Sequence, residues 1–395
     1  MAVQSPEDTI TIAMEPNGGA MSLVVCSLEP WGDVKRRIGI LVDEIVDLEP
    51  SLHVLYVAPP VDVLHLMRRG TLTGVRAPRL ERVHPRIHVL RPRKWWPRLF
   101  GGMADRSLER QVLDAVGEIG LLRPLLWIND AAYAPLTVRT GWPSVYDITD
   151  DWLLASMTPR QRDRLVANED MLFAEAGAVV VCSPELERTR SRIRPVELIP
   201  NGVDVDLFRT PRSRPADLTR SPVALYVGTL HAERVDIPLV MALAEARPDL
   251  HIVLLGPNSL PADATNQMER VPTIHLLGPR PYGQIPAYLQ HADVVIVPHL
   301  VNPFTESLDP IKAYECLAAG RPTVATPVAG FRGLGAPIVV AEPDRFVEAT
   351  MAALDGTGSP GQPGATDPAT IPTWHQRAET MVSLMKRVRR DAALR

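Results

Sequence analysis

The chain has 395 residues, of which 46% are hydrophobic and 22% charged, a composition typical of a globular enzyme with two α/β domains. Its net charge of −4 argues against general binding to nucleic acids, and no hydrophobic run has the length of a transmembrane helix. The single cysteines Cys26, Cys182 and Cys316 lack metal-ligand spacing, and an odd number suits a reducing cytoplasm better than a set of disulfides.

Residues 1–20 lack the basic start and the apolar core of a signal peptide, and we expect them to form a flexible leader. Residues 21–208 then alternate between strand-like and helix-like patterns, with apolar residues at helical spacing over 33–47. The predicted strands lie at residues 22–27, 52–57, 87–90, 125–128, 144–146 and 178–182. This alternation favours a doubly wound parallel sheet, so residues 21–208 are interpreted as a first Rossmann-like domain of the α/β class.

Residues 209–222 are rich in Arg, Pro and Ser, which is typical of a linker, and the pattern then restarts. The predicted strands lie at residues 223–228, 251–256, 273–277, 294–297, 323–325 and 338–340, and the predicted helices at 236–246, 285–291 and 311–319. We expect residues 223–373 to form a second Rossmann-like domain and residues 374–395 a helix that packs back toward the first. Two such domains face each other across a cleft, with ligands at the carboxyl ends of the strands.

The segment 307–326 predicts a short helix followed by a buried strand. Asp309 suits the N-cap of this helix and Pro310 its first helical position. Free amides and the positive dipole end favour phosphate at such a helix start, and Lys312 adds a cation. Glu315, one turn further on, offers a carboxylate that can accept hydrogen bonds from hydroxyl groups such as those of a ribose. The alternative is an ordinary capped helix with a solvated Lys–Glu pair.

Polar residues after the first predicted strand are candidates for the acceptor side of the cleft. Gly32 lies in the loop that follows this strand and permits a substrate to approach the backbone closely. Arg36 and Arg37 come next, in the first turns of a predicted helix. Each either meets an acceptor or a phosphate, or is a solvated arginine.

Three aspartates, Asp147, Asp150 and Asp151, follow another predicted strand of the first domain. One of them is a candidate to orient or deprotonate an acceptor hydroxyl, because that role requires a carboxylate within hydrogen-bond reach. The alternative for Asp150 and Asp151 is to cap a helix.

The segment 68–98 is strongly basic and contains Trp95 and Trp96, with Glu81 as its single acid. Its basic residues are Arg68, Arg69, Arg76, Arg79, Arg82, Arg86, Arg91, Arg93, Lys94 and Arg98. Basic residues beside tryptophans suit anionic head groups and an interfacial anchor, so we expect peripheral membrane contact or a lipid-linked or anionic acceptor. The alternative is a solvated basic loop whose tryptophans pack on the core.

Several segments in the second half carry short motifs whose order and spacing together are specific. These segments are 181–186, 198–204, 226–229, 276–282 and 291–298. Together they resemble GT-B-fold glycosyltransferases of the large retaining family 4. The segment 307–326 is similar to a branch of that family involved in bacterial surface polysaccharides and related glycoconjugates, which carries Ser-x-Asp-Pro-x-Lys-x-x-Glu here. The first domain resembles this branch more loosely, through residues 30–37 and 146–152.

The resemblance implies a GT-B fold and transfer of a sugar from a nucleotide diphosphate sugar to an acceptor hydroxyl with retention. It also implies that no cofactor and no metal are required. Glu315 matches the ribose-binding Glu of the family, and Arg234 stands where the family has a diphosphate-binding Lys. The predicted donor-binding residues are Gly228, Thr229, Arg234, Tyr282, Ser307, Leu308, Asp309, Lys312 and Glu315.

Individual positions in this set keep a second interpretation. Gly228 and Thr229 let the backbone approach the phosphates, although the family often has Arg at the position of Thr229. Tyr282 matches the position that cradles the nucleotide base, or it is an ordinary surface residue. Arg234 binds the diphosphate, or it pairs with an adjacent acid of its own loop.

Two positions depart from the resemblance. Ser307 holds the place of the family's first Glu, and the loop after the strand 125–128 has no His, although many members carry one there. Either Asn129 or Asp130 then takes the role of that His, or a different loop does. The candidates for catalysis are therefore Asn129, Asp130, Asp150 and Asp151.

Two other functions compete with transfer. A GT-B subunit that binds a nucleotide or a partner without turnover is the first, and a nucleotide-sugar epimerase on the same fold is the second. A dehydrogenase is disfavoured, because the turns after Ser27 and Val227 lack the Gly-x-Gly-x-x-Gly phosphate loop. We expect a cytoplasmic protein, peripheral at the inner face of the membrane, whose partners are a nucleotide sugar and an acceptor but no nucleic acid.

Overall fold

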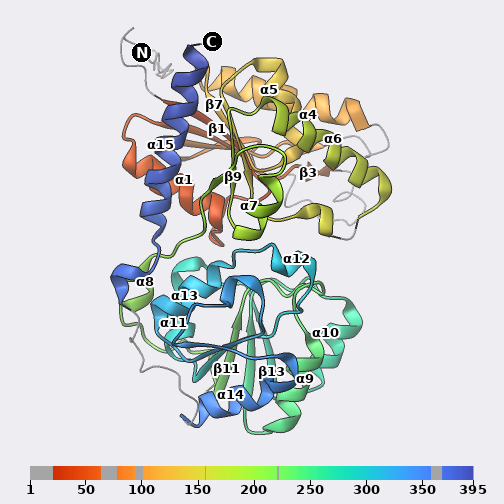
Figure 1. Ribbon diagram of the computed structural model, residues 1–395, viewed down its shortest axis with the longest axis vertical. Helices are drawn as coiled ribbons and strands as arrows, with labels where there is room; N and C mark the ends of the chain where they lie inside the picture. Colours follow the sequence, from red (N-terminus) through yellow and green to blue (C-terminus); the bar gives the residue numbers. More distant parts are fainter. Residues whose placement is uncertain are drawn as a thin grey trace, which may run out of the picture.

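The computed structural model describes residues 21–63, 78–94, 101–155, 157–219, 222–356 and 367–394. They form two α/β domains, stacked along the long axis of the molecule (Figure 1). The leader 1–20, Trp95, Trp96 and several of the predicted basic residues therefore lie outside the described residues. None of the helices described is long and apolar enough to cross a membrane.

The N-terminal domain is built on an eight-stranded sheet in the order β10-β9-β8-β7-β1-β2-β5-β4. Its strands are β1 Ser22–Cys26, β2 His53–Val57, β4 Leu80–His84, β5 Ile87–Leu90, β7 Leu125–Ile128, β8 Ser144–Ile148, β9 Ala178–Val181 and β10 Glu197–Leu198. All neighbouring strands pair in parallel except β4, which pairs with β5 in antiparallel. The helices around it are α1 Arg37–Leu48, α4 Gly101–Glu118, α5 Pro135–Thr140, α6 Pro159–Glu175 and α7 Pro184–Arg190.

The C-terminal domain has a six-stranded sheet in the order β13-β12-β11-β14-β15-β16, with parallel pairing throughout. The strands are β11 Val223–Val227, β12 His251–Leu255, β13 Ile274–Gly278, β14 Val294–Val297, β15 Thr323–Ala325 and β16 Ile338–Val340. The helices are α8 Val205–Arg209, α9 Ile237–Ala246, α10 Ala262–Glu269, α11 Ile285–Gln290, α12 Pro303–Glu306, α13 Ile311–Ala319 and α14 Phe346–Leu354. The predicted fold class, two doubly wound parallel sheets, is confirmed.

The chain crosses between the domains twice, and the two crossings lie side by side. Val203 pairs with Thr373 as an isolated parallel bridge, and a Cβ on Gly202 would lie 2.6 Å from the Thr373 carbonyl carbon. After the second crossing, α15 Trp374–Ala393 runs back along the N-terminal domain (Figure 1). Its apolar face, including Trp374, packs with α1 in the core of that domain. The two domains are therefore joined by a double connection beside the cleft.

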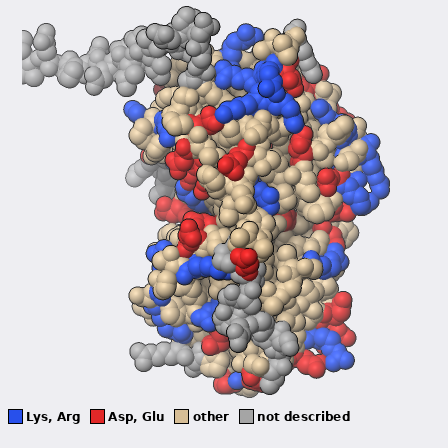
Figure 2. Space-filling model, turned by 60° about the vertical axis from the view of Figure 1, so that its left-hand side comes forward, with Lys and Arg blue, Asp and Glu red and all other residues tan. Residues whose placement is uncertain are grey.

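The strand predicted at 87–90 is present as β5, and much of residues 78–94 forms β4, its turn and β5 rather than the solvated loop of the alternative interpretation. Arg79 pairs with Glu118 at 2.6 Å and Arg91 with Glu81 at 2.6 Å, so part of the positive charge is neutralised. Basic side chains on an edge strand also discourage pairing with other sheets. Figure 2 shows Lys and Arg gathered at the end of the N-terminal domain where α15 ends, with mixed charges over the rest of that face.

Candidate active site between the domains

A cavity of about 430 Å³ lies between the domains at the carboxyl ends of both sheets. Its N-terminal wall comes from the loops after β1, β7 and β8, and its C-terminal wall from the loops after β11, β12 and β13 and from the start of α13. Parallel sheets leave their strand-end loops and helix starts at this edge, where ligands of such folds bind. The location agrees with the cleft expected from the sequence.

The C-terminal wall begins at Gly228, directly after β11. This glycine has a φ of 144°, and a Cβ there would lie 2.5 Å from the Lys312 Nζ. The bare backbone therefore lets the lysine lie against the loop, with Nζ 5.1 Å from the centre of the Tyr226 ring. Burial, reinforced by nearby Arg234, lowers the pKa of Lys312 to about 8.

Glu315 lies one turn further along α13 and lines the same cavity with only 6% of its surface exposed. Burial raises the pKa of its carboxyl to about 7, while the positive charge of Lys312 opposes the shift. Neither residue has a hydrogen bond or ion pair to another side chain of the described chain. A buried carboxylate without donors is costly, so the site favours a ligand that brings hydroxyl groups.

Arg234 reaches the cavity from the loop after β11 and meets the opposite domain. Its guanidinium lies 3.4 Å from the Asp150 carboxylate and 5.2 Å from the centre of the Phe304 ring. The partner is thus Asp150 of the N-terminal wall rather than an acid of its own loop. Burial raises the pKa of Asp150, and Arg234 opposes this shift. Because the pair is loose, the guanidinium remains available to an anion in the cavity.

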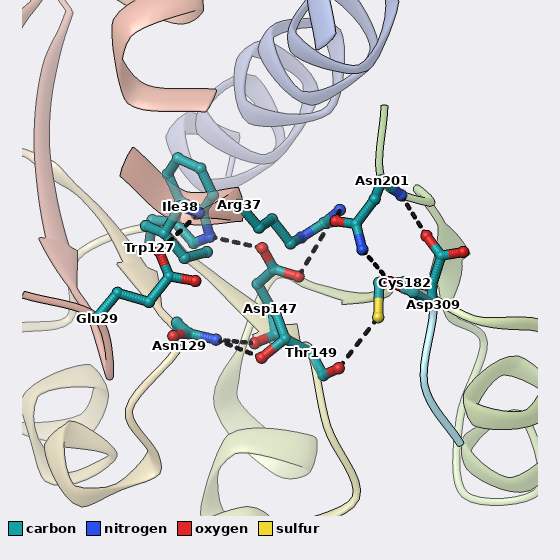
Figure 3. Close-up of polar contacts among 10 residues, drawn as sticks. All are labelled: Glu29, Arg37, Ile38, Trp127, Asn129, Asp147, Thr149, Cys182, Asn201 and Asp309. Carbon is teal, nitrogen blue, oxygen red and sulfur yellow. Dashed lines mark hydrogen bonds and ion pairs between the residues drawn. The ribbon is translucent and has the colours of Figure 1, made fainter. Parts of the chain in front are cut away.

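The N-terminal wall is held by a buried polar network (Figure 3). Arg37, only 3% exposed, donates to Asn201 at 3.1 Å and pairs with Asp147 at 3.4 Å. Asp147 also accepts from the Trp127 indole at 3.1 Å. Arg37 is among the residues that line the cavity, but its guanidinium is already engaged inside the protein, so contact with an acceptor stays a prediction. Arg36 instead is exposed and lies 3.4 Å from the Thr229 hydroxyl across the cleft.

The same network reaches the segment before α13 through Asp309. The Asn201 backbone N–H donates to the Asp309 carboxylate at 2.5 Å, and the Tyr314 hydroxyl donates to it at 2.8 Å. The prediction that Asp309 is the N-cap of this helix is wrong: α13 begins at Ile311 and Pro310 is its N-cap, without a side-chain cap bond. The Asp309 carboxylate instead accepts from Asn201, which lies where the chain crosses between the domains. Asp309 therefore helps to join the two domains.

Of the four candidates for catalysis, Asn129 and Asp150 line the cavity. The Asn129 amide bonds to Leu28, to the Asp147 carbonyl and to Thr149, which ties the loops together. Asp130 caps the short 3₁₀ turn that follows, accepting from the Ala132 N–H at 2.9 Å. Asp151 forms a buried pair with Arg190 at 2.8 Å. Asp130 and Asp151 are not among the lining residues. Each of the two carboxylates is already engaged by a group of the protein.

Some of the remaining predicted residues line the cavity and others do not. Leu308 and Tyr282 line the cavity, and the Tyr282 N–H donates to the Asp33 carbonyl of the other domain at 3.0 Å. Gly32 is not among the lining residues. Ser307 is 1% exposed and its hydroxyl donates to the Phe304 carbonyl at 2.7 Å, so it points away from the cavity.

Sequence reasoning missed Glu29, Lys35, Arg280 and His299, all of which line the cavity. Glu29 lies three residues after the end of β1, and its position after a buried strand was an available signal. His299 follows β14 in the same way; burial, with Lys312 and Arg234 nearby, lowers its pKa well below the usual range. Arg280 and Lys35 lie in loops whose course only the structure gives. Within the described residues, no group of three or more His, Cys, Asp and Glu is arranged to hold a metal ion.

Comparison with known proteins gives a family match in the C-terminal domain. Residues 221–355 match the family model described as Glycosyl transferases group 1, which spans most of the C-terminal domain. The chain is similar to TuaH of Bacillus subtilis (strain 168), a glycosyltransferase named for teichuronic acid biosynthesis, with 23% identity over 223 residues, 52% of this chain and 55% of the relative. It is also similar to a D-inositol 3-phosphate glycosyltransferase of Corynebacterium glutamicum (strain R), with 29% identity over 57% of this chain and 56% of the relative. The chain thus spans about half the length of the curated relatives it matches.

Two solved structures show the same architecture. Alr3699/HepE of Anabaena in complex with UDP-glucose superimposes with a TM-score of 0.58 at 16% identity, over 94% of this chain and 98% of that chain. A trehalose-6-phosphate enzyme of E. coli bound with UDP-2-fluoro glucose gives a TM-score of 0.60 at 14% identity, over 94% and 97%. The chain has the GT-B fold, and the prediction of a GT-B glycosyltransferase is confirmed at the level of the fold and of the family that its C-terminal domain matches.

Proposed function

We propose that this protein transfers a hexosyl group from a nucleoside diphosphate sugar to an acceptor hydroxyl. One observation carries the proposal: the domain that matches a glycosyltransferase family presents Arg234, Lys312 and the unpartnered Glu315 to a single interdomain cavity. The solved structures named above hold UDP-glucose and UDP-2-fluoro glucose, which supports a UDP-hexose as donor.

In this proposal the diphosphate lies against the backbone of Gly228 and Thr229, with Arg234 and Lys312 as its cations. The leaving diphosphate gains negative charge as the glycosidic bond breaks, so fixed positive groups aimed at it lower the barrier. An anion beside Lys312 also favours the protonated lysine, whose pKa is about 8 without ligand. Glu315 accepts hydrogen bonds from the ribose hydroxyls, which supply the donors that its buried carboxylate lacks.

Finer features of the proposal rest on the family resemblance. They are retention of anomeric configuration, independence of metal ions and a role in bacterial polysaccharide or glycoconjugate synthesis. A lipid-linked or anionic acceptor and a cytoplasmic site at the inner face of the membrane belong to the same proposal. The basic stretch that includes Arg79 and Arg91 supports that acceptor class, although part of its charge is paired.

The test is nucleotide binding by thermal shift and calorimetry with UDP, GDP, dTDP and ADP, because a ligand of the folded state raises its stability. For the nucleotide that binds, we expect Arg234→Ala and Glu315→Ala each to weaken binding about 10- to 100-fold, the usual effect of losing a charged hydrogen-bond partner. Arg345→Ala is the control, because this arginine pairs only with Glu348 on the surface. Unchanged affinity in both site variants would remove the donor-site assignment.

A nucleotide-binding subunit without turnover is the second candidate, and Ser307 favours it. The side chain at the place of the family's first Glu is buried against the Phe304 carbonyl and offers nothing to a donor sugar. Release of UDP from UDP-glucose in the presence of an acceptor would exclude this candidate. Tight UDP binding without any such release would support it.

A further inference from the structure

Glu29 sits on a rigid loop at the carboxyl end of β1 and lines the interdomain cavity. Its N–H donates to the Ser27 hydroxyl at 2.9 Å, and its carbonyl accepts from the Tyr56 hydroxyl at 2.9 Å. The Trp31 ring stands edge-on to Tyr56 with centres 4.9 Å apart. The backbone that carries this carboxylate is therefore fixed on both sides, as a reacting group requires.

The carboxylate itself accepts from backbone N–H groups at the start of α1, those of Ile38 and Gly39. Its Oε2 accepts from the Ile38 N–H at 3.1 Å, in the first turn of α1 (Figure 3). No Lys or Arg nitrogen of the described chain lies within ion-pairing distance of it. Glu29 thus keeps acceptor capacity that no cation of the described protein uses.

The aspartates of the same wall differ in this respect. Asp147 pairs with Arg37, Asp151 with Arg190, and Asp150 with Arg234 of the opposite domain. A carboxylate held by a guanidinium has its proton affinity reduced and its oxygens occupied. Among the acids considered on this wall, Glu29 is therefore the one best able to accept a proton.

The charged and titratable groups that face Glu29 come from two elements. Arg36 and Arg37 on α1 favour its ionised form, and Tyr56 lies on β2. Burial outweighs these effects and raises the pKa of Glu29 to about 7. A base with a pKa near the working pH combines a sufficient ionised fraction with a useful proton affinity.

We propose that Glu29 is the catalytic base that takes the proton of the acceptor hydroxyl; this rests on the proposed function. The acceptor oxygen forms its bond to the anomeric carbon on the face from which the diphosphate leaves, as retention requires, while the bond from that carbon to the diphosphate oxygen breaks. The electron pair of the broken bond leaves with the diphosphate, and the hydroxyl proton passes to the Glu29 carboxylate. The loop is on the acceptor side of the cleft, opposite the wall that holds Lys312 and Glu315.

Glu29→Gln tests this assignment without removing the loop's support, because the glutamine oxygen can still accept from the Ile38 N–H. The assay is turnover of UDP-glucose with water as the acceptor, from about pH 5.5 to 8.5. We expect kcat to fall about 10²- to 10⁴-fold, the usual contribution of a general base, and the fall in rate below about pH 7 to disappear. UDP affinity should stay unchanged, and Glu118→Gln, an exposed partner of Arg79, should behave as wild type.

A kcat within twofold of wild type, with the same pH profile, would overturn the assignment and leave the leaving diphosphate as the proton acceptor. A second measurement does not need turnover: a carboxyl ¹³C titration of the wild-type protein, in which the Glu29 signal is identified by its loss in Glu29→Gln. A midpoint near 7 supports the proposal, and a midpoint near that of an exposed glutamate overturns it. Failure of the wild-type protein to bind any nucleotide would instead overturn the proposed function, and with it this inference.

Discussion

The two walls of the cavity use buried charge in opposite ways. Behind the N-terminal wall Arg37 meets Asp147, and Asp151 meets Arg190, so these charges have partners within their own domain, and Glu29 is the exception on that wall. On the C-terminal wall Lys312 and Glu315 lie in the same cavity without such partners in the described chain. A buried charge with a protein partner supports the fold, whereas one without a partner keeps its interaction for a ligand. Local sequence cannot separate the two cases.

The adjacent residues Arg36 and Arg37 give the largest expected contrast. Arg37→Ala leaves Asp147, which is fully buried, without its cation and should lower the free energy of unfolding by about 3–5 kcal/mol. Arg36→Ala is the matched control: its side chain is exposed, and its loss should change stability by less than about 0.5 kcal/mol. Urea denaturation of both variants measures the difference. Equal effects would mean that the N-terminal wall does not depend on the buried pair.

The strands of both domains could be predicted from the sequence because strands of buried parallel sheets appear as continuous apolar runs. Val294–Val297 and Ile338–Val340 were predicted to the residue. The antiparallel strand β4 was missed, because Arg82 and His84 give it the look of a basic loop. Strand assignment therefore failed where one edge of a sheet faces solvent.

The site was predicted less well, for a different physical reason. The order of segments along the chain pointed to Lys312 and Glu315, which are close together on one helix. Arg37 is engaged by Asp147, which is 110 residues away along the chain, and Asp309 is engaged by Asn201, which is 108 residues away. Pairings of this kind depend on how the domains fold and pack, so neither residue type nor local spacing reveals them.

The C-terminal wall should make stability depend on pH. The pKa of Glu315 is raised from 4.5 to about 7 in the folded state, so between these values the folded protein binds more protons than the unfolded chain. Stability from this group is thus greatest at low pH and falls as the pH rises to about 7, by up to about 3 kcal/mol. We expect Glu315→Gln to flatten this slope in urea denaturation at pH 5 and pH 8. The same slope in both proteins would contradict the unpartnered state of the carboxyl.

The smallest expected effect tests whether the two walls cooperate at the diphosphate. Arg36 reaches the Thr229 hydroxyl at 3.4 Å, at the position where family 4 often has an arginine, so the N-terminal domain brings a guanidinium to that place. Arg36→Ala should weaken UDP binding about fivefold, near 1 kcal/mol, because the side chain is exposed and screened by solvent.

Calorimetry on the double variant Arg36→Ala with Thr229→Arg provides the rescue. We expect it to recover most of the lost affinity, because the same group then comes from the C-terminal wall. We expect Arg36 to contribute only when the domains are closed, because it comes from the opposite domain, and an arginine at 229 to act in any arrangement. UDP should therefore compact the wild-type protein more than the double variant in small-angle scattering. Recovered affinity with equal compaction would show that Arg36 binds UDP without coupling the two walls, and no recovery would place the diphosphate away from Thr229.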